Sequence, residues 1–209
     1  MHVTGRYLNN TYSFSYQNNG YCMDDLFRML ESIHPMTDAL KQHLYGVLKE
    51  QLLVKKGFLL EAGHISRRVC YVKEGLLRCY YTIADADVSS WFMKEGDVIF
   101  SVESFLLQIP GYESIQALED TIVYYISYNE LQHIYKIYPE FNFIGRVLTE
   151  KYYVLSEQRV RTMRMQRAID RYEHLMANHP DLILRVPAKY LASYLGLTEV
   201  TLSKIKAKQ

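Results

Sequence analysis

The spacing of apolar residues changes twice along the chain and divides it into a helical beginning, a β-rich middle and a helical end. Residues 23–33 and 37–50 repeat apolar side chains at helical spacing, so each segment is predicted to form a helix. Residues 1–20 have no clear period, and we expect them to form a loosely ordered lead-in.

The middle of the chain, from about residue 52 to Ser127, consists of short apolar runs separated by glycines and by the Asp-Ala-Asp sequence at 85–87. Short strands with turn residues between them are typical of an all-β sandwich or barrel rather than of alternating strands and helices. A predicted short helix over 101–108 interrupts this pattern.

Helical spacing returns after Ser127, first in a short helix that ends at Pro139 and then in a longer amphipathic one. The apolar face of the longer helix either pairs with the same face of a second copy or packs on the chain's own strands. That face consists of Phe141, Ile144, Leu148, Tyr152 and Leu155. A hinge between the β-rich middle and the C-terminal helices is expected at 156–163.

A further helix is expected from Thr162 to just before Pro180, and it carries a row of arginines. The row could follow DNA phosphates, or it could be a solvated face that forms ion pairs with nearby carboxylates; the solvated face is favoured. The row consists of Arg161, Arg164, Arg167 and Arg171, and the carboxylates are those of Glu157, Asp170 and Glu173.

The stretch "VPAKYLASYLGLTEVTLSKI", residues 186–205, predicts two short helices around Gly196, with Pro187 in the first turn and Thr198 as the second N-cap. The side chains expected to point inward are Leu191, Leu195, Leu202 and Ile205. The second helix would present Glu199, Val200, Thr201, Ser203, Lys204 and Lys206 to solvent. This pattern is typical of a helix-turn-helix, although a terminal helical hairpin that closes a core shares it.

Composition favours a soluble cytoplasmic protein that binds a polyanion through its C-terminal end. The net charge of the 209 residues is +1, but from Leu155 onward ten basic residues face five acidic ones, a difference of +5. The sequence has no run of about 18 apolar residues and no secretory signal, so we expect neither membrane contact nor secretion. Three scattered cysteines argue against a disulfide framework.

We find no arrangement of residues that indicates a catalyst, metal site or cofactor. The seven histidines lack the spacing of metal-ligand motifs, and His64 stands alone where a cupin-type enzyme would need clustered histidine and glutamate ligands. An iron–sulfur centre would need a cysteine cluster near the N-terminus, where only Cys22 occurs.

The stretch 186–205 resembles the helix-turn-helix of the Crp/Fnr family of bacterial transcription regulators. The "RY", "HP" and "VP" pairs at 171–172, 179–180 and 186–187 are similar to one branch of that family. The resemblance extends back to about residue 23 through "KKGFLLEAG", "YVKEGLLRCYY", "KEGDVIFSVESF" and "IQALEDT".

The resemblance implies an α+β chain: a cyclic-nucleotide-binding-like β-roll, or jelly roll, with flanking helices, a long dimerisation helix and a C-terminal all-α domain that binds double-stranded DNA. The corresponding boundaries are a lead-in at 1–20, the effector domain at 21–138, the dimerisation helix and hinge at 139–160, and the helix-turn-helix domain at 161–209. DNA contacts would fall on Thr198, Glu199, Val200, Thr201, Ser203, Lys204 and Lys206.

The phosphate-binding segment departs from the family pattern. Phe100 and Ser101 stand where a Gly-Glu pair would be, and residues 111–113 stand where an Arg-Ser/Thr-Ala would be. Because residues 97–120 contain no Arg or Lys, a buried phosphate would lack a cation, so we do not expect cyclic AMP to bind. The expected pocket residues are Trp91, Phe100, Ser101, Glu103, Ser104, Tyr112 and Glu113.

That pocket could hold another small-molecule effector, or it could be empty or filled by aromatic side chains such as Trp91, Phe92 and Phe105; the second alternative is favoured. The family's recognition helix is usually followed by a β-hairpin wing, and because the sequence ends at Gln209 we expect no full wing. The sequence therefore predicts a homodimeric Crp/Fnr-type transcription regulator that is not an enzyme. The alternative is a ligand-binding or protein-interaction module that has lost sequence-specific DNA binding.

Overall fold

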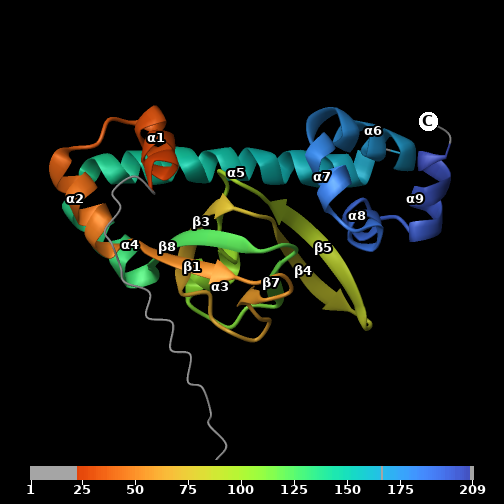
Figure 1. The fold of residues 1–209 in the computed structure, drawn as a ribbon, viewed down its shortest axis with the longest axis horizontal. Coiled ribbons are helices and arrows are strands. Elements are labelled where there is room, and N and C mark those ends of the chain that lie inside the picture. The colour runs from red at the N-terminus through yellow and green to blue at the C-terminus, as the bar shows by residue number, and fades with distance from the viewer. Residues whose placement is uncertain (1–22, 166, 208–209) are drawn as a thin grey trace, which may run out of the picture.

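The structure, a computed structural model, describes residues 23–165 and 167–207 and combines a β-roll with helices at both ends (Figure 1). The predicted lead-in at 1–20 lies outside the described residues. The helices are α1 (Asp24–Ile33), α2 (Asp38–Val47), α3 (Val102–Leu107), α4 (Tyr128–Ile137), α5 (Pro139–Met165), α6 (Ala168–Asn178), α7 (Pro180–Arg185), α8 (Ala188–Tyr194) and α9 (Glu199–Lys206). The strands are β1 (Lys49–Leu53), β2 (Phe58–Leu60), β3 (Arg68–Glu74), β4 (Leu77–Ile83), β5 (Ala86–Met93), β6 (Val98–Ile99), β7 (Glu113–Ala117) and β8 (Thr121–Ser127).

The β-roll consists of two antiparallel four-stranded sheets with the strand orders β1-β8-β3-β6 and β2-β7-β4-β5. Alternate side chains of both sheets point inward and form one apolar core. Its most deeply buried members are Val72, Leu77, Ile115, Ala117 and Val123. The α+β class and the β-roll predicted from sequence are confirmed, including the short helix α3 between β6 and β7.

A second core joins α1, α2 and α4 to the first half of α5. Two helices of this group begin at side-chain caps: the Thr37 hydroxyl accepts from the Leu40 amide, and Ser127 forms a capping box with Glu130 at the start of α4. The predicted second helix was too long, because α2 ends at Val47 and Lys49 already pairs with β8.

Helix α5 is 27 residues long and runs along the length of the molecule above the β-roll (Figure 1). It continues through the segment 156–163 that was expected to be a hinge, and the next helix starts only at Ala168. Helix α5 therefore links the helices at one end of the molecule to α6–α9 at the other.

Helices α6–α9 form the third core, and this core includes side chains from the β-roll. Leu76, Phe92 and Leu118 pack with residues of the C-terminal helices such as Leu191 and Leu195. The C-terminal helices are thus docked on the β-roll.

Candidate nucleic-acid interface and neighbouring cavity

Residues 186–205 fold as two short helices joined at Gly196. Pro187 is the N-cap of α8, and Gly196 has a φ of 65°, a left-handed conformation that favours glycine. The Thr198 hydroxyl accepts a hydrogen bond from the Thr201 amide at 3.2 Å and thereby caps α9. Gly196 and Thr198 take the predicted turn and N-cap positions, whereas Pro187 precedes α8 and does not belong to its first turn.

The seam between α8 and α9 is apolar. Leu191, Leu195, Leu202 and Ile205 are all buried, as the spacing predicted, and the small Ala192 is buried beside them. A closely packed seam fixes the direction in which the second helix presents its outer face.

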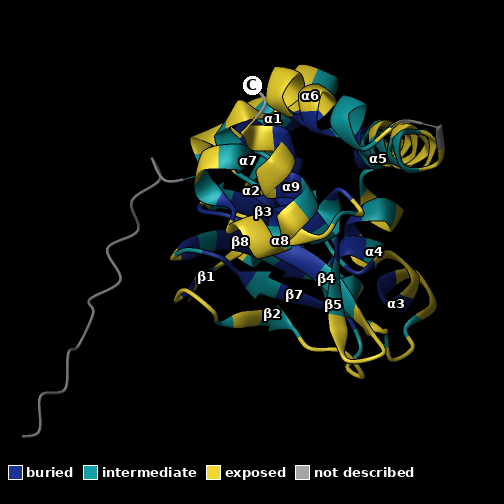
Figure 2. Cartoon of the chain, turned by 90° about the vertical axis from the view of Figure 1, so that its right-hand side faces the viewer, coloured by how far each residue is buried: buried dark blue, intermediate teal, exposed yellow. Residues whose placement is uncertain are grey.

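The outer face of α9 carries the residues predicted to contact DNA. Glu199, Ser203, Lys204 and Lys206 are exposed, and Val200 has 64% of its surface exposed. Thr201 is partly exposed, and its hydroxyl lies 2.9 Å from that of Thr198. In both views α9 lies on the far side of α8 from β5, so the β-roll does not cover this face (Figures 1 and 2).

The row of arginines does not act as one surface. Arg161 and Arg164 are exposed, and Arg167 pairs with Asp170 at 2.9 Å. Arg171 is partly buried and donates from Nε to the Leu195 carbonyl at 2.8 Å, which helps to fix the end of α8.

Helix α8 is attached to the backbone of the edge strand β5 by two hydrogen bonds of one side chain. The Ser193 hydroxyl donates to the Asp87 carbonyl at 2.9 Å and accepts from the Ser89 amide at 2.9 Å. The ring of Phe92 packs beside that of Tyr194, with 5.1 Å between their centroids. The first helix of the helix-turn-helix is therefore held against a strand of the β-roll.

Arg78 of β4 lies at the centre of this contact, with only 1% of its side chain exposed. Its guanidinium lies between the rings of Tyr80 and Tyr190, 4.1 and 3.8 Å from their centroids. Its Nε donates to the Ser89 hydroxyl at 2.9 Å, and its Nη1 donates to Asp87 Oδ2 at 3.2 Å. A cation of the β-roll is thus enclosed by side chains from both parts of the molecule.

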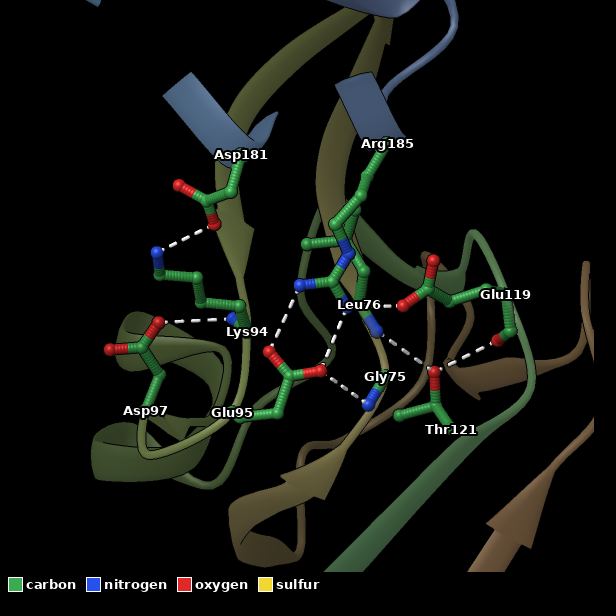
Figure 3. Close-up of polar contacts among 9 residues, drawn as sticks. All are labelled: Gly75, Leu76, Lys94, Glu95, Asp97, Glu119, Thr121, Asp181 and Arg185. Atoms are coloured by element: carbon green, nitrogen blue, oxygen red, sulfur yellow. Dashed lines mark hydrogen bonds and ion pairs between the residues drawn. The ribbon is translucent and has the colours of Figure 1, made fainter. Parts of the chain in front are cut away.

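A second set of contacts joins α7 to loops of the β-roll (Figure 3). Arg185 donates to both carboxylate oxygens of Glu95 at 2.8 and 2.9 Å and also to Glu119. Hydrogen bonds from Arg185 lower the pKa of Glu95 to about 2. Lys94 pairs with Asp181 at 2.6 Å in the same region.

A β-bulge in β5 changes the side of the sheet to which its residues point. Cys79 pairs with Trp91 and Tyr80 with Ser89, so Ser90 is the extra residue on β5. The bulge allows Ser89 and Phe92 to face α8, while Ser90 and Trp91 line a cavity on the other side. One strand therefore separates the cavity from the docked helix-turn-helix.

This cavity has a volume of about 700 Å³ and lies between the β-roll, α1, α3 and α5. Six residues predicted from sequence line it: Trp91, Phe100, Ser101, Glu103, Tyr112 and Glu113. Ser104 lies behind the lining, where its hydroxyl accepts from the Ser66 amide and donates to the Ile109 carbonyl. Phe105 also lines the cavity, but Phe92 packs against Tyr194 instead, so the aromatic side chains named from sequence do not fill this space.

Solved structures share this arrangement of β-roll, long helix and C-terminal helices. FixK2 from Bradyrhizobium japonicum matches with a TM-score of 0.68 and 18% identity over 78% of this chain and 84% of that one. A CooA variant from Carboxydothermus hydrogenoformans matches with a TM-score of 0.65 and 22% identity, over 86% and 83%. The c-di-GMP responsive regulator CLP from Xanthomonas campestris matches with a TM-score of 0.67 and 14% identity, over 82% and 91%.

These three proteins are regulators with the Crp/Fnr architecture. The chain has the Crp/Fnr fold. Neither models of protein families nor curated proteins matched its sequence. The resemblance stated from the sequence motifs is therefore supported by the three-dimensional fold.

Within this Crp/Fnr fold, much of the apolar face predicted for dimerisation packs inside the chain. Phe141 and Ile144 are buried against α1, α2 and α4, and Leu148 packs on the same core. Tyr152 packs on the β-roll, and Leu155 is partly exposed. A different set of large apolar side chains on α5 is exposed: Phe143, Tyr153, Val154 and Val160.

The docking residues of this Crp/Fnr fold were missed from sequence. Ser193 and Asp87 lie 106 positions apart, and neither belongs to a recognisable motif. One signal in the sequence was available: residues 190–195 contain two tyrosines besides the apolar residues that pack against α9, which indicates a second packing surface on α8. In the part of the chain that the structure describes, no helix is long and apolar enough to cross a membrane, and no cluster of three potential metal ligands occurs.

Proposed function

We propose that this protein is a DNA-binding transcription regulator of the Crp/Fnr type. The observation that carries the proposal is the exposed polar face of α9 on a helix-turn-helix whose inner seam is fully buried. Lys204 and Lys206 would neutralise phosphates, and the hydroxyls of Thr198, Thr201 and Ser203 would donate to phosphates or base edges. The similarity in fold to FixK2, CooA and CLP supports this function.

Sequence preference would come from the first turn of α9. Glu199 would accept a hydrogen bond from a cytosine amino group, and Val200 would contact a thymine methyl group. Lys204 supplies a point charge and lacks the planar fork of arginine that binds guanine through two hydrogen bonds. We therefore infer that phosphate contacts provide much of the affinity and that binding weakens steeply with salt.

The functional form would be a homodimer held along α5. The exposed apolar side chains Phe143, Tyr153, Val154 and Val160 provide a surface for this contact. Two-fold symmetry would place two copies of α9 on successive turns of one DNA groove, so the binding site would be a palindrome.

Cyclic AMP is not the ligand that we propose for the β-roll. The described cavity lining contains the carboxyl groups of Glu103 and Glu113 and no Arg, Lys or His. A cyclic phosphate would therefore be buried near carboxyl groups without a cation, which is strongly unfavourable.

The test is selection of binding sites from a random duplex pool by the full chain, at low and at near-physiological salt. We expect a two-fold symmetric motif, and we expect Lys204→Ala and Thr201→Ala each to weaken binding to it by about ten-fold, or roughly 1.4 kcal/mol. Lys136→Ala at the end of α4 removes an exposed lysine far from α9 and should leave binding unchanged.

The alternative is a protein-interaction module that no longer reads DNA sequence. Val200 favours it, because 64% of this apolar residue is exposed at a position where a polar group would read a base. Recovery of no motif, with weak binding that disappears as salt rises, would support this alternative and overturn sequence-specific DNA recognition.

A further inference from the structure

The cavity described above is lined by parts of the molecule that are distant in sequence. Leu30 of α1, Trp91 of β5, Phe105 of α3 and Leu148 of α5 contribute to its wall. Its volume of about 700 Å³ lies within the range of pockets that bind small molecules.

The chemistry of the wall selects against anions. Most of the lining is apolar, and the described lining residues include no Arg, Lys or His. Glu113 is partly buried, and burial raises the pKa of its carboxyl group despite a hydrogen bond from Ser101. An anionic ligand would find carboxyl groups and no counter-charge in this wall.

The wall also contains a polar group without a protein partner. The Ser90 hydroxyl is buried and has no hydrogen-bond partner among the described residues. Ser90 is the extra residue of the β-bulge, and the bulge places it beside Trp91 in the cavity wall. Buried hydroxyls are normally hydrogen-bonded, and a rotation about χ1 would bring this one to a ligand in the cavity.

We propose that the cavity binds a neutral, mostly apolar small molecule that forms a hydrogen bond with Ser90 or Glu113. A regulatory role for this ligand rests on the proposed DNA-binding function, whereas its binding does not. The volume, the apolar lining, the lack of cations and the available hydroxyl together define this ligand class.

The cavity is lined by two elements that could transmit ligand binding, the strand β5 and the long helix α5. Ser90 and Trp91 line it from β5, whose opposite face holds α8 through Ser89 and Phe92. Tyr152 lines it from α5 and accepts a hydrogen bond from the Val98 amide at 2.7 Å. A ligand that contacts β5 and α5 would therefore shift the balance between positions of the helix-turn-helix.

The experiment uses the full chain and a matched pair of fluorescent probes. N-phenylnaphthylamine is neutral and apolar and carries one N–H donor, and anilinonaphthalenesulfonate has the same rings with an added sulfonate. We expect saturable binding of the neutral probe at one site per chain and binding of the sulfonate at least about ten-fold weaker. Excess cyclic AMP should not displace the neutral probe.

A pair of variants tests whether the probe binds in the cavity. Ser90→Leu fills the space beside Trp91 and should weaken binding of N-phenylnaphthylamine by about ten-fold or more, because close-packed interiors admit no overlap. Thr82→Leu adds the same side chain at an exposed position of β4 outside the cavity lining and should leave binding unchanged. Far-ultraviolet circular dichroism confirms that both variants are folded; if Ser90→Leu fails to fold, the probe pair on the wild-type chain remains decisive.

Three outcomes would overturn the proposal: no saturable binding of the neutral probe, equal or tighter binding of the sulfonate, or loss of probe binding as the chain associates in parallel sedimentation runs. The last outcome would show that a second copy covers the cavity. Loss of probe binding with intact DNA recognition refutes only the ligand site. Probe binding without DNA recognition refutes only the proposed function.

Discussion

At the residue scale, several side chains of this protein have positions that their local sequence explains. Gly196 takes the left-handed conformation that the turn requires, and a Cβ at this position would lie 2.7 Å from Met163 Cε. Thr198 caps α9, and Leu202 and Ile205 face inward. These roles were predictable because turns, caps and helical spacing depend on neighbours in sequence.

The Glu113 carboxyl group provides a pH-dependent prediction. Burial raises its pKa in the folded protein above 4.5, so the folded state binds this proton more tightly than the unfolded chain. Its contribution to stability is therefore present at low pH and is lost as pH rises from about 4.5 through the folded pKa. Glu113→Gln stays neutral, so we expect its melting temperature relative to wild type to rise between pH 4 and pH 8.

The control for this prediction is Glu103→Gln, which removes one negative charge from an exposed position of α3 that also lines the cavity. Its melting temperature relative to wild type should change little over the same pH range. A Glu113→Gln difference that stayed constant or shrank with pH would contradict the assignment. Scanning calorimetry at several pH values measures both variants.

At the scale of elements, the sequence predicted type and order well, but it predicted ends and surroundings less well. The expected helix over 37–50 ends at Val47, because Lys49–Leu53 gain hydrogen bonds as a strand paired with β8. Residues 156–163 remain helical in α5, where Arg159 donates to the Tyr194 carbonyl and stacks on its ring. Such partners lie far away in sequence, so local spacing does not reveal them.

A hydrogen bond of one phenol joins helix α5 to the β-roll, and this contact gives a prediction at the same scale. The Tyr152 hydroxyl accepts from the Val98 amide at 2.7 Å, and burial raises the pKa of Tyr152 to about 12. Tyr152→Phe removes the acceptor and should reduce the free energy of unfolding by about 1–3 kcal/mol. Urea denaturation measures the change.

Tyr45→Phe is the matched control, because Tyr45 of α2 is 43% exposed and belongs to neither the cavity lining nor the proposed dimer surface. Its effect should stay within about 0.5 kcal/mol. Equal effects of the two variants would show that the Tyr152 hydroxyl does not fix α5 to β6.

At the scale of the whole molecule, the docking of α6–α9 on the β-roll could not be predicted from sequence. The contact depends on single residues of separate segments: Arg78 lies between rings of Tyr80 and Tyr190, and Ser193 reaches β5. The exposed face of α9 was predictable because it belongs to one short amphipathic segment. The cavity residues were located in part through the family resemblance, but the β-bulge that directs Ser90 into the cavity leaves no clear signal in the sequence.

Arg185 gives the prediction that tests this docking. Its guanidinium is bound to Glu95 and Glu119, and Arg185→Ala would leave two carboxylates close together without their cation. We expect faster hydrogen exchange in α7, α8 and β5, unchanged exchange in α1 and α2, and a stability loss of about 1 kcal/mol, because these groups are partly exposed. Hydrogen-exchange mass spectrometry measures the first two effects.

Arg167→Ala is the control for this variant. It removes the ion pair between Arg167, which precedes α6, and Asp170 of α6, and 83% of the Arg167 side chain is exposed. Arg167→Ala should leave hydrogen exchange in β5 and α7 unchanged.

The effect of Arg185→Ala on stability should also depend on pH. The pKa of Glu95 is lowered from 4.5 to about 2, so the stabilisation is complete above about 4.5 and is lost as pH falls toward 2. The difference between wild type and Arg185→Ala should shrink over that range. If the difference were independent of pH, or if exchange rose equally in α1, Arg185 would support the fold as a whole and would not hold the helix-turn-helix against the β-roll.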